Sequence, residues 1–71
     1  MEIREQIIYM QVRIARMFAE RLGLSLDEAA RRLNASHGFS YIADNWGLLH
    51  VEGDEAVYED VCSYLARQEV R

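Results

Sequence analysis

The chain contains no proline and no lysine, and it has only one cysteine and one tryptophan. Because proline is the strongest helix breaker, its absence allows long helices to form. A single cysteine cannot form an internal disulfide, so we expect a reducing compartment such as the cytoplasm. A membrane-spanning helix needs a run of about 18 apolar residues, which is missing here, and the first residues lack the layout of a secretory signal. We therefore expect a cytoplasmic protein that does not cross a membrane.

Length and composition indicate one small domain with a compact core. A chain of 71 residues is short enough to form one domain, and domains of this size bury only about 60% of their unfolded surface. Apolar residues make up 51% of the chain, which is enough for one core and leaves apolar side chains for an interface. We expect a single helical domain over residues 1–71.

Charge is unevenly distributed along the chain. Residues 1–35 hold six arginines and five acids, a balance of +1, whereas residues 36–71 hold two arginines and seven acids, a balance of −5. No arginine lies between Arg32 and Arg67. The acidic half is either an ordinary solvated surface or a docking surface for a basic partner.

Apolar residues recur at helical spacing along nearly the whole chain. Gly23, Gly38 and Gly47 are each followed by an apolar residue, a pattern typical of a glycine that ends a helix in the left-handed conformation. Ser25 and Glu28 form a capping box that predicts a helix start. The sequence thus predicts an all-α fold, a four-helix bundle with one short helix. Its helices should cover about residues 3–22, 25–37, 40–46 and 54–69.

Few side chains are suited to catalysis or to metal binding. His37, His50 and Cys62 are 13 and 12 residues apart and show none of the paired spacings of a zinc site. No phosphate-binding glycine loop and no Ser/His/Asp set is apparent. We predict no enzymatic activity, no cofactor and no metal. We expect His50 to have a structural role instead: it should donate a hydrogen bond to a backbone carbonyl and, together with Gly47, fix a turn.

Three parts of the chain form a recognisable pattern: Gly23-Leu24-Ser25 with Gly38, then Tyr41-Ile42-Ala43-Asp44-Asn45-Trp46-Gly47-Leu48-Leu49-His50, and then Asp60-Val61-Cys62-Ser63-Tyr64-Leu65. In this pattern, and most of all in its central block, the chain resembles a family of short bacterial helical domains of unknown function. Genes of that family often lie beside, or are fused to, genes for proteins similar to ADP-ribosyltransferase toxins. The resemblance implies a small partner protein in a toxin–antitoxin-like or phage-related module, and it implies no catalytic residues.

The residues predict a non-catalytic module that binds a protein, and the resemblance implies that this partner is an ADP-ribosyltransferase-like neighbour. An acidic helix suits a basic cleft on such a partner, and aromatic residues dominate interface hot spots. The predicted partner-binding residues are Trp46, Asp54, Glu55, Tyr58, Glu59 and Asp60.

Two other functions remain open at this stage. The apolar stripe of the first helix is wide enough to pair with a second copy, which would make the chain a homodimeric structural domain. The segment from Leu24 to Leu33 also resembles the first helix of a helix-turn-helix. The following segment, residues 36–46, has no arginine or lysine and carries Asp44, so nucleic-acid binding is the weaker of the two alternatives.

Overall fold

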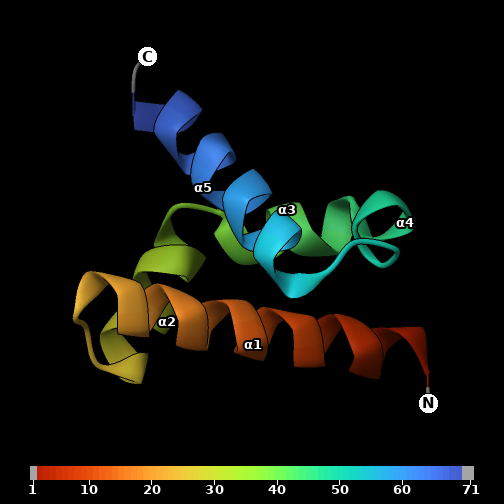
Figure 1. Cartoon of the computed structure of the whole chain (residues 1–71), viewed down its shortest axis with the longest axis horizontal. Helices are drawn as coiled ribbons and strands as arrows, with labels where there is room; N and C mark the ends of the chain where they lie inside the picture. The colour runs from red at the N-terminus through yellow and green to blue at the C-terminus, as the bar shows by residue number, and fades with distance from the viewer. Residues whose placement is uncertain (1, 70–71) are drawn as a thin grey trace.

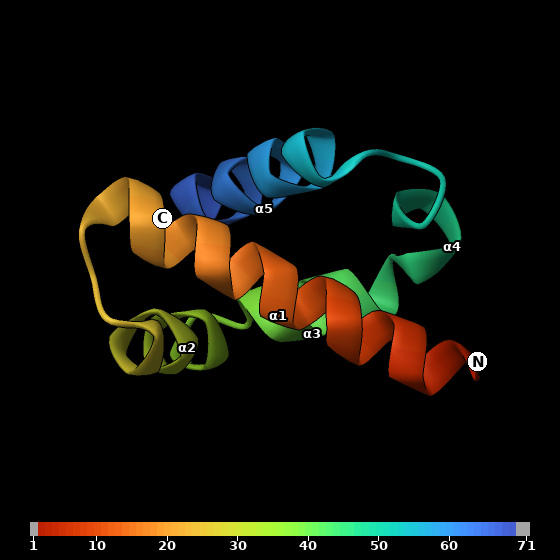
Figure 2. The same cartoon turned by 60° about the horizontal axis from the view of Figure 1, so that its bottom comes forward.

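A computed structural model describes residues 2–69 of the chain, and the fold is all-α, as predicted. The helices of the described residues are α1 (Ile3–Leu22), α2 (Leu26–Ala35), α3 (Gly38–Asp44), α4 (Trp46–Leu49) and α5 (Asp54–Glu69). Helix α1 is the longest, and α2, α3 and α5 all pack against it (Figure 1). Figure 2 shows α1 running between α2 on one side and α5 on the other.

The core lies where α1, α2, α3 and α5 converge. Its fully buried large side chains are Ile14, Leu33, Ile42, Val57 and Val61. Ala15 and Ala19 are buried on α1 and Ala29 on α2, and such small side chains allow two packed helices to approach closely. Each of these four helices contributes at least one of the fully buried large side chains, as expected for amphipathic helices.

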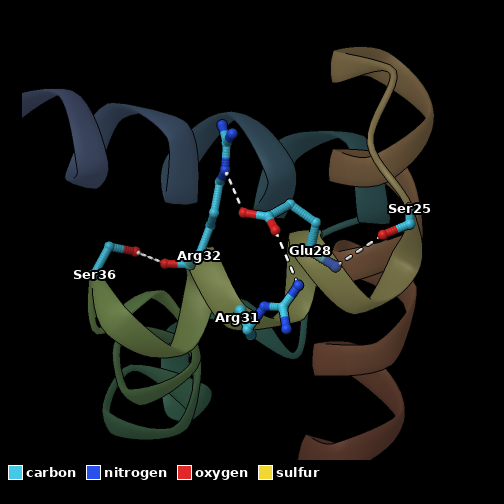
Figure 3. Close-up of polar contacts among 5 residues, drawn as sticks. All are labelled: Ser25, Glu28, Arg31, Arg32 and Ser36. Atoms are coloured by element: carbon cyan, nitrogen blue, oxygen red, sulfur yellow. Dashed lines mark hydrogen bonds and ion pairs between the residues drawn. The ribbon is translucent and has the colours of Figure 1, made fainter.

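The first two helix boundaries are those that the sequence predicts. Gly23 adopts the left-handed conformation with φ 68°, and the Leu24 amide donates to the Ala19 carbonyl at 2.9 Å. The Ser25 hydroxyl accepts a hydrogen bond from the Glu28 amide at 3.0 Å (Figure 3). The Glu28 carboxylate binds Arg31 and Arg32, each at 3.1 Å. These arginines lower the pKa of Glu28, Arg32 more than Arg31.

The prediction that Gly38 ends the second helix is wrong. Helix α2 ends at Ala35, two residues before the predicted end, and His37 is the residue that adopts the left-handed conformation, with φ 67°. Gly38 begins α3 and is buried against Leu33. A Cβ atom on Gly38 would lie 2.8 Å from Leu33 Cδ2, so this glycine is needed for close approach of the two helices.

The predicted third helix at residues 40–46 is divided in two by the structure. Helix α3 ends at Asp44, and the Asn45 side-chain amide donates to the Tyr41 carbonyl at 2.9 Å. Helix α4 then begins at Trp46. Gly47 lies inside α4 and is not in the left-handed conformation, so the predicted glycine stop there is also wrong. The start of the last helix at Asp54, after Gly53, is confirmed.

Candidate functional site

An open groove lies between the N-terminal half of α1 and the segment that runs from α4 to the start of α5. In Figures 1 and 2, α4 lies at the same end of the molecule as this half of α1. The groove has a volume of about 310 Å³. Its lining residues are Gln6, Tyr9, Met10, Arg13, Trp46, His50, Glu52 and Asp54. The sequence places three of these, Trp46, His50 and Asp54, among the candidate site residues.

Trp46 and His50 are the fixed aromatic part of the groove. The Trp46 indole is half-buried and packs against the core. His50 Nδ1 lies 2.8 Å from the Trp46 carbonyl oxygen, and the two rings are 5.8 Å apart. Because a carbonyl oxygen only accepts hydrogen bonds, Nδ1 carries the proton in this contact. The predicted bond from His50 to a backbone carbonyl is therefore present, and Nε2 is an acceptor when the ring is neutral.

Arg13 crosses from α1 to the start of α5 at the edge of the groove. Its Nε atom lies 3.0 Å from Asp54 Oδ2, and its Nη2 atom lies 3.7 Å from the sulfur of Met10. Met10 is buried and forms the apolar part of the lining. The predicted docking residue Asp54 is thus paired with a positive charge within the chain, and the pair contributes no net charge to the groove.

Glu52 lines the groove and lies beside a second acidic residue, Asp60. Its carboxyl lies beside that of Asp60 on α5, and this contact raises the pKa of Glu52. Within residues 2–69 neither acid forms an ion pair with an arginine. The groove therefore has an excess of negative charge on its Glu52 side.

Glu55 and Tyr58 lie on a different side of α5, against the C-terminal half of α1. The Arg21 guanidinium binds the Glu55 carboxylate through two hydrogen bonds of 2.6 and 2.7 Å, which lowers the pKa of Glu55. The Arg21 Cζ atom also lies 4.6 Å from the centre of the Tyr58 ring. Tyr58 is only 8% exposed, packs against Phe18 at 6.4 Å between ring centres, and has its pKa raised by burial and by Cys62.

The six predicted partner-binding residues therefore do not form one surface. Trp46 and Asp54 line the groove, while Glu55 and Tyr58 contact α1 elsewhere. Asp60 faces Glu52, and Glu59 is exposed on α5. Sequence reasoning missed Tyr9, Arg13 and Glu52 as site residues. The pairing of Arg13 with Asp54 joins residues 41 positions apart, and no spacing rule within one helix indicates such a contact.

Two stacked tyrosines join the central and last blocks of the sequence pattern. Tyr41 of α3 and Tyr64 of α5 have ring centres 4.5 Å apart and planes inclined by 23°. Ile42 and Leu49 of the central block and Val61 of the last block are buried in the core. These pattern residues consequently have structural positions that connect α3, α4 and α5.

Other features of the described residues bear on the class of protein. Across residues 2–69 no three His, Cys, Asp or Glu side chains gather as they would around a metal ion. The helices in this part of the chain are either too short or too polar to span a bilayer. A second hollow, of about 360 Å³, lies near the C-terminal end of α1 and includes Phe18, Leu65 and Arg32 in its lining.

The fold and the groove define a small all-α domain with a mixed aromatic and charged surface. Residues 10–68 match the model of a family described as protein of unknown function (DUF3791), and the chain belongs to that family. No curated protein and no solved structure matches the chain.

Proposed function

We propose that this chain is a non-catalytic protein-binding module, an accessory or antitoxin-like partner of an ADP-ribosyltransferase-like protein in the bacterial cytoplasm. The observation that carries the proposal is the open groove, in which the half-buried Trp46 lies among acidic and aromatic side chains. Buried aromatic anchors with a polar rim are typical of the centre of protein interfaces. The net charge of −4 favours association with a basic partner.

Exposed apolar side chains, one in the groove lining and two close in sequence to lining residues, support a protein ligand. Leu48 and Val51 are 71% and 76% exposed, and Tyr9 is 55% exposed. Leu48 belongs to α4 and Val51 to the turn that follows it, so both are close in sequence to Trp46 and His50. Of these three residues Tyr9 lines the groove, and exposed large apolar side chains near a hollow are a feature of binding surfaces.

Co-purification tests this proposal directly. The tagged chain is expressed together with the protein encoded beside its gene, and the mass of the eluted species is measured. We expect a stoichiometric complex. Elution of the chain without its neighbour even at low salt concentration would contradict the proposed partner.

Charge-reversed variants then test the surface that binds. Glu59→Lys and Asp60→Lys should weaken the complex by about tenfold each, because a basic partner would meet a positive charge. Glu20→Lys, which makes the same change at an exposed site on α1, is the matched control and should leave affinity unchanged. Circular dichroism confirms that each variant is folded.

Self-association is a second candidate, favoured by the exposed part of α1. Ile8 and Val12 are exposed, large and four positions apart, so they lie on one face of the helix. A second copy could cover this face. Sedimentation at high concentration measures the mass, and a dimer that is lost on the double change Ile8→Ser and Val12→Ser would support this candidate. A strictly monomeric mass would remove it.

A further inference from the structure

Three walls of different chemistry meet in the groove described above. Trp46 and Tyr9 supply aromatic rings, Met10 supplies a buried apolar surface, and Glu52 supplies a carboxyl. His50 adds a ring nitrogen, Nε2, which accepts a hydrogen bond in the neutral state because Nδ1 is used by the Trp46 carbonyl. Aromatic faces combined with hydrogen-bond acceptors favour a cation that is flat and has several N–H donors.

The charges of the lining indicate the sign of the ligand. Arg13 and Asp54 compensate each other at the edge of the groove, where Nε and Oδ2 are 3.0 Å apart. The hydrogen bond between the Glu52 and Asp60 carboxyl groups, followed by desolvation and by charge repulsion, raises the pKa of Glu52, and the two groups repel each other when both are ionised. A positive charge placed beside Glu52 would relieve this repulsion, whereas an anion would increase it. The unbalanced part of the groove is thus complementary to a cation.

We propose that the groove takes an arginine side chain of the partner protein, with its guanidinium beside the rings of Trp46 and Tyr9 and beside the carboxylate of Glu52. This inference rests on the proposed function and names the chemistry of the partner segment. Arginine fits better than lysine because its planar guanidinium stacks on aromatic rings and presents a fork of donors to a carboxylate. The aliphatic part of the side chain would contact Met10.

The only tryptophan of the chain lies in this groove, so its fluorescence reports on the site. The full chain is titrated with N-acetyl-arginine amide, and the citrulline derivative, which has the same shape without the charge, is the control. We expect a saturable change in Trp46 emission with the arginine derivative and binding of the citrulline derivative that is weaker by about fivefold or more. An equal response to both compounds, or no saturable response, would overturn the inference.

Two variants assign the effect to the acid in the groove. Glu52→Gln keeps the size of the side chain and should weaken arginine binding by about fivefold. Glu20→Gln removes the same charge from an exposed site on α1, outside the groove lining, and should leave arginine binding unchanged. Equal loss in both variants would show a general charge effect and would overturn the assignment to the groove.

The same variants separate this inference from the proposed function. A complex with the neighbouring protein that forms equally well with Glu52→Gln would leave the proposed function standing and overturn the arginine site. Binding of the arginine derivative without any complex would do the opposite. Sedimentation of the chain alone identifies the case in which an arginine of a second copy occupies the groove, because Glu52→Gln would then dissociate a dimer.

Discussion

Helix α5 is held in different ways on its two sides. On the side of α1, the acids Asp54 and Glu55 meet Arg13 and Arg21, so negative charge is compensated within the chain. On the side of α3 and α4, Tyr64 stacks on Tyr41, and the acids there lie beside each other. The comparison separates charges that hold the fold together from charges that are left for a partner, a distinction that the net charge of −4 conceals.

The largest expected effect distinguishes the aromatic contacts of the two sides. Tyr58→Ala removes a side chain that is 8% exposed, together with its contacts to Phe18 and Arg21, and should cost about 3 kcal/mol of unfolding free energy. Tyr64→Ala removes a half-buried ring and should cost about 1–2 kcal/mol. Urea denaturation measures both. An equal or greater loss for Tyr64→Ala would contradict the view that the α1 side is the more structural one.

Two glycines of the α3–α4 side should respond in opposite directions. Gly38→Ala places a Cβ atom 2.8 Å from the end of the fully buried Leu33 side chain and 3.3 Å from its carbonyl oxygen, and should destabilise by about 1 kcal/mol. Gly47→Ala meets open space inside α4 and should stabilise by about 0.5–1 kcal/mol, because alanine favours the helix. Thermal unfolding of the two variants checks the signs. Stabilisation by both would show that Leu33 moves aside.

The smallest expected effects concern the charges themselves, and they differ in sign. The pKa of Glu55 is lowered by Arg21, so its contribution to stability is present above the pKa of the unfolded state and is lost as the pH falls through the lowered value. Glu55→Gln should therefore lower stability at neutral pH and have little effect in acid. The exposed Glu59→Gln is the matched control on the same helix.

Glu52 should show the reverse behaviour. Its pKa is raised by Asp60, so ionisation of the folded state costs stability as the pH rises past the pKa of the unfolded state, and acid removes that cost. Glu52→Gln should be slightly stabilising at neutral pH and nearly neutral in acid. Unfolding curves of both variants at neutral pH and at about pH 3, below the ordinary carboxyl pKa, measure the two differences. A loss of stability with Glu52→Gln at neutral pH would show that Glu52 has a basic partner in solution.

The sequence predicts the parts of the fold that depend on neighbours in the chain. The left-handed Gly23, the cap at Ser25 and the start of α5 at Asp54 follow from local rules, and the structure confirms them. Gly38 and Gly47 fit the same local pattern but do not end a helix. Gly38 permits close packing against Leu33, and Gly47 lies inside α4. Only the position of Leu33 reveals the task of Gly38.

The residues of the candidate site are harder to predict from the sequence, because their contacts depend on how the helices pack against one another. The acids of the last helix could be recognised, yet the partners of Asp54 and Glu55 come from α1, 41 and 34 positions away. The approach of Glu52 to Asp60 depends on the turn between α4 and α5. His50 is the exception, since its partner, the Trp46 carbonyl, lies one helical turn before it.

The short connections between α2, α3 and α4 make the groove sensitive to chain length. Two residues, Ser36 and the left-handed His37, join α2 to α3, and Asn45 alone joins α3 to α4. Since each residue turns a helix by about 100°, one residue inserted within α3 would rotate the indole of Trp46 away from Tyr9. A single substitution between residues 36 and 45 leaves the length of this segment unchanged, whereas an insertion or a deletion does not. The geometry of the groove therefore depends first on the number of residues in this segment and only then on their identity.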